Sequence, residues 1–216
     1  MGTELAIRRD GWLRRRYRRS ALGRALTRAG DQLMRRHVEW VHSTTAPHVR
    51  PGRLLDVGAW DCRVSALLRD RSGCDVTAVD VVDRNCTDVP LVVYDGRRMP
   101  LPDGAFDTVT ILYALHHAAD DLAILREARR ACAPGGRVIV AEDRADNRAQ
   151  RAIAVGFHVW LLSVTGMGWK GSFRSTAAWR ERFAAAGLAV ESVHPLGPHM
   201  GRRLWPRNIL FVLAPV

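Results

Sequence analysis

The stretch that most constrains this chain is residues 53–62, Arg-Leu-Leu-Asp-Val-Gly-Ala-Trp-Asp-Cys. Its apolar first half predicts a buried strand, and Gly58 predicts a tight turn into the helical pattern that follows. A second strand pattern at 75–80 ends in Asp80, 22 residues after Gly58. This order of elements predicts an open parallel α/β sheet that binds a nucleoside at its strand ends, with Asp80 on the ribose hydroxyls.

Trp60 and Cys62 stand where such a turn usually carries glycine. The turn therefore lacks the second glycine that allows close approach of a dinucleotide pyrophosphate, which argues against a nicotinamide-dependent oxidoreductase. Because the motif is incomplete, the function has to be inferred from the rest of the chain.

Five more strand patterns follow, so the chain predicts a single doubly wound, mostly parallel seven-stranded sheet with an antiparallel final strand. They lie at 91–94, 108–113, 138–141, 190–193 and 209–213. Helical patterns at 62–70, from Asp120 or Asp121 to Pro134, and from Ser175 to Gly187 alternate with these strands. The 18 uncharged residues 152–169 reach the length of a membrane span, but their three glycines and His158 favour a helix and loop over the sheet.

The net charge of +11 is concentrated at the N-terminus. Residues 1–36 hold eleven arginines against three acidic residues, which leaves only +3 for the rest of the chain. Residues 1–45 are therefore predicted to be a basic helical extension of a domain at 46–216. Packing on the domain, peripheral contact with an anionic membrane surface, and nucleic-acid binding are three alternatives for this extension, in that order of preference.

The four cysteines form no CxxC pair, and the histidine spacing is not that of a zinc motif, so no metal site is predicted. Without a recognisable signal peptide, the expectation is a cytoplasmic protein with reduced thiols, associated with a membrane only if the basic extension docks there. The sequence does not indicate an oligomeric state.

Residues 53–143 resemble the class I S-adenosylmethionine-dependent methyltransferases, in the group related to quinone biosynthesis. The resemblance rests on ordered blocks rather than on one glycine turn. These are Leu-Leu-Asp-Val-Gly at 54–58, Val79-Asp80, Asp95-Gly96, Met-Pro-Leu-Pro-Asp-Gly-Ala-Phe-Asp at 99–107, Leu-His-His at 115–117 and Ala-Pro-Gly-Gly-Arg at 133–137.

The resemblance implies S-adenosylmethionine as cofactor and assigns residues to it. Gly58, with Ala59 and Trp60, would approach its methionine end, with Asp56 beneath the turn. Asp80, with Val81, would hold the ribose. Asp95 and Gly96 would contact the adenine. The sulfonium would be lined by Leu112 and Tyr113.

His116 and His117 are the candidate catalytic residues, because a base is needed only when the methyl acceptor arrives protonated. A hydrogen bond at a helix entry is the alternative for this pair. Glu142 and His158 are further candidates. Residues 145–172 are predicted to form a substrate-side lid, and its site residues are Phe157, His158, Trp160 and Trp169.

The predicted function is therefore methylation, on oxygen, nitrogen or carbon, of a small molecule with apolar or aromatic surface. Two alternatives stay open. One is an RNA methyltransferase that uses the basic N-terminal helices, although nucleic acid is not the favoured partner. The other is a catalytically silent binding module, which the tryptophan at position 60 would suit.

Overall fold

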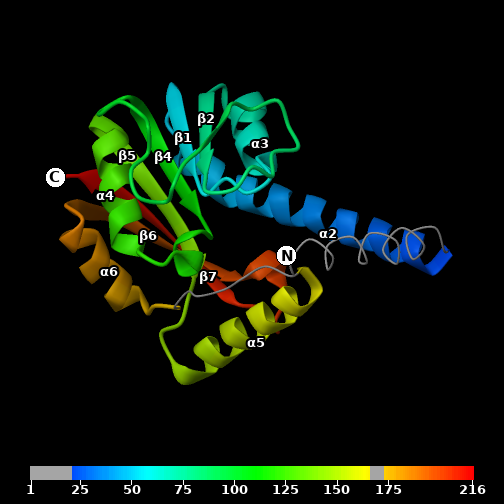
Figure 1. The fold of residues 1–216 in the computed structure, drawn as a ribbon. Coiled ribbons are helices and arrows are strands. Elements are labelled where there is room, and N and C mark those ends of the chain that lie inside the picture. The colour runs from blue at the N-terminus through cyan, green and yellow to red at the C-terminus, as the bar shows by residue number, and fades with distance from the viewer. Residues whose placement is uncertain (1–20, 166–172) are drawn as a thin grey trace, which may run out of the picture. The chain divides into compact units, whose positions relative to one another are not determined.

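The computed structural model describes residues 21–165 and 173–216, and the side chains of 28–159 and 173–216 (Figure 1). The chain divides into two compact units, one that ends at Trp40 and one that comprises Val41–Val216. The helix α2 (Ala21–Thr45) crosses this division. The second unit contains the sheet and all the site residues considered below.

Within the described residues, seven strands form one sheet in the order β3-β2-β1-β4-β5-β7-β6. Strands β1 to β5 run parallel, and β7 is antiparallel to both β5 and β6. Their bounds are β1 Arg53–Val57, β2 Asp75–Asp80, β3 Leu91–Val93, β4 Phe106–Leu112, β5 Cys132–Asp143, β6 Leu188–Pro198 and β7 Arg207–Pro215. The predicted mostly parallel seven-stranded fold with its reversed last strand is confirmed.

Two helices of the second unit, α4 and α6, begin where their capping residues predict. Asp120 accepts a hydrogen bond from the amide of Ala123 at 3.0 Å, and Ser175 accepts one from the amide of Ala178 at 3.2 Å. The bounds are α3 Arg63–Ser72, α4 Asp121–Ala131, α5 Arg148–Thr165 and α6 Thr176–Ala185, with short 3₁₀ turns η1 Ala46–His48, η2 Leu115–His117 and η3 His199–Gly201.

Helix α4 ends at Ala131, earlier than the predicted stop at Pro134, because Cys132 already pairs with Phe106 of β4. The last two strands are also longer than the predicted 190–193 and 209–213. Their pairing runs from Leu188 with Pro215 to Pro198 with Arg207, although the apolar pattern covers only the middle of this ribbon.

Both faces of the sheet are covered. Leu54 packs into a cluster with α3, whereas its neighbour Leu55 packs into the larger cluster with α4 and α6, as the two-residue period of a strand requires. Figure 1 shows α4 and α6 side by side on one face, where Trp179 and Phe183 are almost completely buried. No described helix is long and apolar enough to cross a membrane.

The order of strands reverses between β1 and β4, since β2 lies on the far side of β1 and β5 on the far side of β4. In open α/β sheets, ligands bind at the carboxyl ends of the strands beside this point. The loops that follow β1, β2, β3 and β4 meet there, and they carry most of the residues that the sequence singled out.

Candidate functional site

The turn after β1 keeps the shape of a glycine turn without most of its glycines. Gly58, Trp60 and Cys62 all have left-handed backbones, with φ of 73°, 54° and 61°. The amides of Gly58 and Ala59 both donate to the carbonyl of Val79, at 2.8 and 3.3 Å. These hydrogen bonds hold the turn against the end of β2, so the surrounding structure maintains a conformation that costs a non-glycine residue energy.

Gly58 itself cannot be replaced without movement. A β-carbon at this position would lie 2.6 Å from the β-carbon of Ala114, which is closer than two non-bonded carbon atoms come to each other. The glycine therefore lets the turn after β1 pack against the segment that follows β4. This packing brings the predicted methionine end of the cofactor site next to the loop that carries His116 and His117.

Asp80 is held in place by two backbone amides. Its Oδ2 accepts from the amide of Trp60 at 2.8 Å, and its Oδ1 accepts from the amide of Val82 at 3.1 Å. Each carboxylate oxygen can accept two hydrogen bonds, so one lone pair on each oxygen is left for a ligand. Two acceptors at a fixed spacing fit a vicinal diol, which is the group that the sequence assigns to Asp80.

The indole of Trp60 lies on the surface of the turn. The residue is 38% exposed, and the guanidinium of Arg84 lies over its ring at 4.2 Å from the ring centre. The side chain is thus engaged in a cation–π contact at the rim. Trp60 contributes to the site through its backbone amide, which orients Asp80.

Asp95 and Gly96 follow β3 and lie beside Val81. An added β-carbon on Gly96, where φ is 79°, would lie 3.3 Å from Cγ1 of Val81. The amides of Arg97 and Arg98 donate to Oδ1 of Asp95 at 2.9 and 3.3 Å, and the Arg97 amide is the main reason why the pKa of Asp95 is lowered. Asp95 is exposed and ionised, and its carboxylate is an acceptor suited to an amino group.

Asp56 lies beneath the turn and connects three elements. The hydroxyl of Ser65 in α3 donates to its Oδ2 at 2.5 Å, and the hydroxyl of Thr110 in β4 donates to its Oδ1 at 2.8 Å. Burial raises the pKa of this carboxyl, and the two hydroxyl donors partly offset the increase. Its contacts in this structure are therefore with hydroxyls of the scaffold rather than with the amides of the turn.

Leu112 and Tyr113 end β4 at the switch point. Leu112 pairs with Ala141 of β5, and the amide of Tyr113 donates to the carbonyl of Ala141 at 2.8 Å. Tyr113 has a left-handed backbone with φ of 58°, which turns the chain out of the sheet towards η2. Its ring meets His199 edge to face at 5.6 Å, and burial raises the pKa of its phenol well above the usual value.

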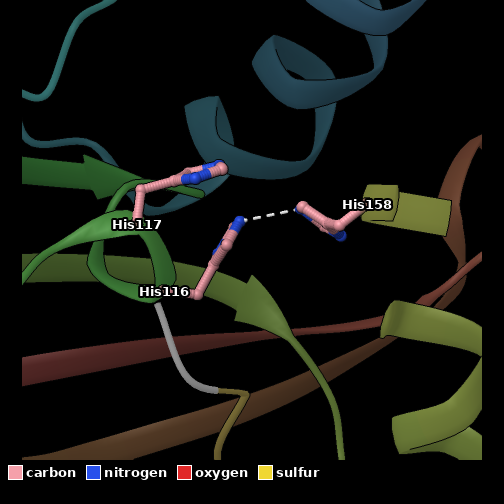
Figure 2. A group of neighbouring side chains, drawn as sticks. All are labelled: His116, His117 and His158. Atoms are coloured by element: carbon pink, nitrogen blue, oxygen red, sulfur yellow. Dashed lines mark hydrogen bonds between the residues drawn. The ribbon is translucent and has the colours of Figure 1, made fainter. Parts of the chain in front are cut away.

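Three histidines come together beyond β4 (Figure 2). His116 and His117 come from η2, and His158 comes from α5. The Nε2 atoms of His116 and His158 are 3.0 Å apart. Glu142, at the end of β5, positions this group, since its Oε2 lies 2.5 Å from Nδ1 of His116 and its Oε1 accepts from the amide of Leu115 at 2.8 Å.

The electrostatics differ among the three rings. Burial, followed by the proximity of the other two rings, lowers the pKa of His117 to about 3. Burial and His116 lower the pKa of His158 to about 4. Burial also acts against a charge on His116, but the Glu142 carboxylate outweighs it and the pKa of His116 is raised.

A series of buried polar side chains connects this histidine cluster to the last two strands. Oδ2 of Asp143 lies 3.8 Å from Nδ1 of His158, and its Oδ1 accepts from the side-chain amide of Asn208 at 2.5 Å. The amide oxygen of Asn208 lies 2.9 Å from Nδ1 of His199. Burial raises the pKa of Asp143 to about 7.

The predicted substrate-side residues fall in different places. His158 is buried and belongs to the histidine cluster, whereas the ring of Phe157 packs on Trp205 at a centroid distance of 5.0 Å. Trp160 lies in α5, but its side chain is outside the described set, and Trp169 is outside the described residues altogether.

Sequence reasoning did not find every member of the cluster. Phe173 stacks on His116 at 5.3 Å and meets His158 edge to face at 4.7 Å, although it lies far from both in sequence. The prediction of no metal ligands rested on local spacing, and the structure brings together three imidazoles of which two are separated by 42 residues. No local pattern signals such a cluster.

Comparison with known proteins identifies the same part of the chain. Residues 55–140 match the family model described as "Methyltransferase domain". A demethylmenaquinone methyltransferase of Beutenbergia cavernae is 40% identical over 101 residues, which is 43% of this chain and 42% of the relative. The chain thus aligns with less than half of the length of this curated relative.

Solved structures match over more of the chain and confirm the fold. One is a chain from a complex between the Haloferax volcanii Trm112 methyltransferase activator and a methyltransferase. It is 21% identical with a TM-score of 0.66, and the match covers 87% of this chain and 95% of that one. Another is a geranyl diphosphate methyltransferase in complex with SAM. It is 13% identical with a TM-score of 0.63, and the match covers 83% of this chain and 84% of that one.

Proposed function

We propose that this chain carries a class I S-adenosylmethionine-dependent methyltransferase domain and transfers the methyl group of S-adenosylmethionine to a small molecule with apolar or aromatic surface. The match of residues 55–140 to a methyltransferase domain and the similarity to a demethylmenaquinone methyltransferase support this proposal. The observation that carries this proposal is the turn at 58–62. It keeps its left-handed shape around Trp60 and Cys62 and holds Asp80 with two acceptor positions free for a diol.

The residues at the strand ends fit the cofactor. Asp80, with Val81, would hold the ribose hydroxyls, and Asp95 and Gly96 would contact the adenine. The turn at 58–60 would lie along the methionine end, above Asp56, with Leu112 and Tyr113 near the sulfonium. S-adenosylmethionine supplies an already activated methyl group, so this chain has mainly to position the cofactor and the acceptor.

The acceptor would lie beyond β4. His116 and His117 are the candidate catalytic residues there, and residues 145–172 are the proposed lid, with Phe157, His158, Trp160 and Trp169 on the substrate side. An apolar acceptor is supported by the aromatic residues of this segment. The similarity to a demethylmenaquinone methyltransferase and to a geranyl diphosphate methyltransferase, both named for molecules with a large apolar part, supports it too. The acceptor atom, oxygen, nitrogen or carbon, is left open.

Calorimetry tests the cofactor proposal directly. The wild-type chain is expected to bind both S-adenosylmethionine and its demethylated product. Asp80→Asn removes the charge and one acceptor, and loss of a charge-assisted hydrogen bond costs about 1.5–3 kcal/mol, so binding should weaken at least about tenfold. Asp88→Asn is the matched control, because Asp88 is an exposed carboxylate that pairs with Arg69 away from the site.

Three results would contradict the proposal in different ways. No binding of either ligand by the wild-type chain would refute the cofactor assignment. Equal weakening by Asp80→Asn and Asp88→Asn would refute the assigned role of Asp80. If binding occurred but only RNA was methylated, the acceptor class would be wrong, and the basic residues 1–45 would become the candidate RNA-binding segment. A chain that binds cofactor but methylates neither class would be the silent binding module.

The lid is tested by acceptor turnover. Once an acceptor has been found in a panel of apolar metabolites, Trp160→Ala and Trp169→Ala should lower its turnover while leaving cofactor affinity unchanged. Unchanged turnover in both variants would refute the assignment of this segment to the substrate side. Retention of the chain on anionic vesicles, compared with a variant in which the arginines of 1–36 are replaced by glutamine, tests the proposed peripheral membrane contact.

A further inference from the structure

The geometry points to a metal site: we propose that His116, His117 and His158 bind one divalent cation of the zinc class through their ring nitrogens. The binding of the ion does not depend on the proposed methyl transfer. Its use in the reaction does rest on that proposed function.

The distances come close to those of a metal site. One ring nitrogen from each histidine lies within 4.8 Å of the other two, and the Nε2 atoms of His116 and His158 are 3.0 Å apart. A tetrahedral zinc ion with Zn–N bonds of 2.0–2.1 Å separates its ligand nitrogens by about 3.3 Å. His116 and His158 therefore need only a small separation, and the half-buried His117 is the ligand that has to move inward.

The opposite ring nitrogens are already engaged in the way that metal ligands require. Nδ1 of His116 lies 2.5 Å from a Glu142 oxygen, and Nδ1 of His158 lies 2.9 Å from the carbonyl oxygen of Ala154. A metal-bound histidine almost always donates its second N–H to a carboxylate or a backbone carbonyl, which fixes the ring and exposes the other nitrogen. Both rings thus turn Nε2 towards the same point, as Figure 2 shows.

The hydrogen-bond roles direct a nitrogen lone pair of His158 at the proposed site. A backbone carbonyl only accepts, so Nδ1 of His158 carries a proton and its Nε2 presents a lone pair. That lone pair faces Nε2 of His116 at 3.0 Å and accepts a hydrogen bond from it in the metal-free chain. A metal ion would replace the proton of this hydrogen bond and would also draw in His117.

The ligand set and its position indicate which ion would bind and what it could do. Three imidazoles favour zinc, cobalt or nickel over magnesium, which prefers oxygen ligands. Three protein ligands leave a fourth position open, as in catalytic zinc sites. Ala114 packs against Gly58, so this position lies near the predicted methionine end of the cofactor. An acceptor hydroxyl bound there would release its proton to water more readily and become a better nucleophile.

Metal titration of the tag-free, chelator-treated full chain tests the site. Zinc should bind with a stoichiometry of one in calorimetry, cobalt should give the visible spectrum of a four-coordinate nitrogen site, and magnesium should not compete. His117→Ala is the primary variant, because this ring is half-buried and its loss leaves the His116–Glu142 contact in place; it should weaken zinc binding at least about 100-fold. Glu142→Gln alters the group that holds Nδ1 of His116 and should weaken zinc binding about 10–100-fold.

The control is a second histidine pair of the same fold. The rings of His48 and His194 lie 4.2 Å apart, and His48→Ala and His194→Ala should leave zinc affinity unchanged. Absence of one-to-one binding in the folded wild-type chain would overturn the proposal, as would equal affinity in wild type and His117→Ala. Calorimetry with S-adenosylmethionine on the metal-free chain separates the two proposals, since cofactor binding without zinc binding would refute only the metal site.

Discussion

Replacing Gly58 by alanine tests the packing that joins the two halves of the site. Two costs add at this position. A left-handed backbone costs an L-residue about 1–2 kcal/mol, and the new β-carbon would lie 2.6 Å from that of Ala114, an overlap of the kind that costs about 1–3 kcal/mol. Gly58→Ala should therefore lower the free energy of unfolding by about 2–5 kcal/mol.

Two further variants separate the costs. Gly73 has a φ of 65° and nothing within 4 Å of an added β-carbon, so Gly73→Ala measures the backbone cost alone, about 1–2 kcal/mol. The double variant Gly58→Ala/Ala114→Gly removes the overlap and should recover about 1–3 kcal/mol of the loss. Equilibrium urea unfolding, followed by circular dichroism, gives all these values on one scale.

The reasoning would be refuted if Gly58→Ala cost no more than Gly73→Ala, or if the double variant were no more stable than Gly58→Ala. The same proteins should be titrated with S-adenosylmethionine. If the contact between Gly58 and Ala114 sets the position of the turn, Gly58→Ala should also weaken cofactor binding, whereas Gly73→Ala should leave it unchanged.

Other predictions concern single side chains. Burial raises the pKa of Cys62 from 9.0 to about 12, so above pH 9 the thiol ionises in the unfolded chain before it does in the folded one. The free energy of unfolding should therefore fall by about 1.4 kcal/mol per pH unit because of this thiol. Urea unfolding at pH 8 and 10 measures this fall, and Cys62→Ala should remove the part that comes from Cys62. Alkylation by iodoacetamide at pH 8 should modify the exposed Cys86 before Cys62, as read by peptide mass mapping; the reverse order would contradict the burial of Cys62. Arg130→Lys should lower the free energy of unfolding by about 1–3 kcal/mol, because one ammonium cannot replace a guanidinium that bonds two carboxylates and two loop carbonyls. Trp60→Gly should change stability by less than about 1 kcal/mol, since relief of the left-handed backbone offsets the lost contact with Arg84 and the added chain entropy; a loss above 2 kcal/mol would refute a rim position for this indole.

The sheet could be predicted well because the predicted strands are short apolar runs, and four of the seven end at or are followed by a carboxylate or glycine, namely Gly58, Asp80, Asp95 and Glu142. Asp80 and Asp95 could be placed at the ends of neighbouring strands from this pattern alone, and the structure has both there. The ends of β6 and β7 could not be predicted, because their outer residues are held by pairing with each other rather than by an apolar period.

The histidine cluster shows the limit more sharply. The sequence makes His116 and His117 candidates because they follow β4, and it makes His158 a candidate on the substrate side, but no local pattern shows that the three rings meet. Their meeting depends on where α5 lies in three dimensions. Glu142 is a further candidate in the sequence, and the structure shows which groups it holds, the ring of His116 and the amide of Leu115. Roles of this kind depend on which atoms face each other, and residue order does not determine that.

The three left-handed residues at 58, 60 and 62 have a consequence for finding and modifying domains of this type. A sequence search that requires glycine at alternate positions would miss this chain. A structural search would find it if it looked for two successive amides that donate to one carbonyl, as Gly58 and Ala59 do to Val79, followed by an amide that donates to a carboxylate, as Trp60 does to Asp80. Positions 60 and 62 also show that side chains other than hydrogen can occupy the left-handed positions of this turn. Cys62 is buried and Trp60 is exposed, so position 60 is the natural place to attach a reporter group next to the proposed nucleoside site.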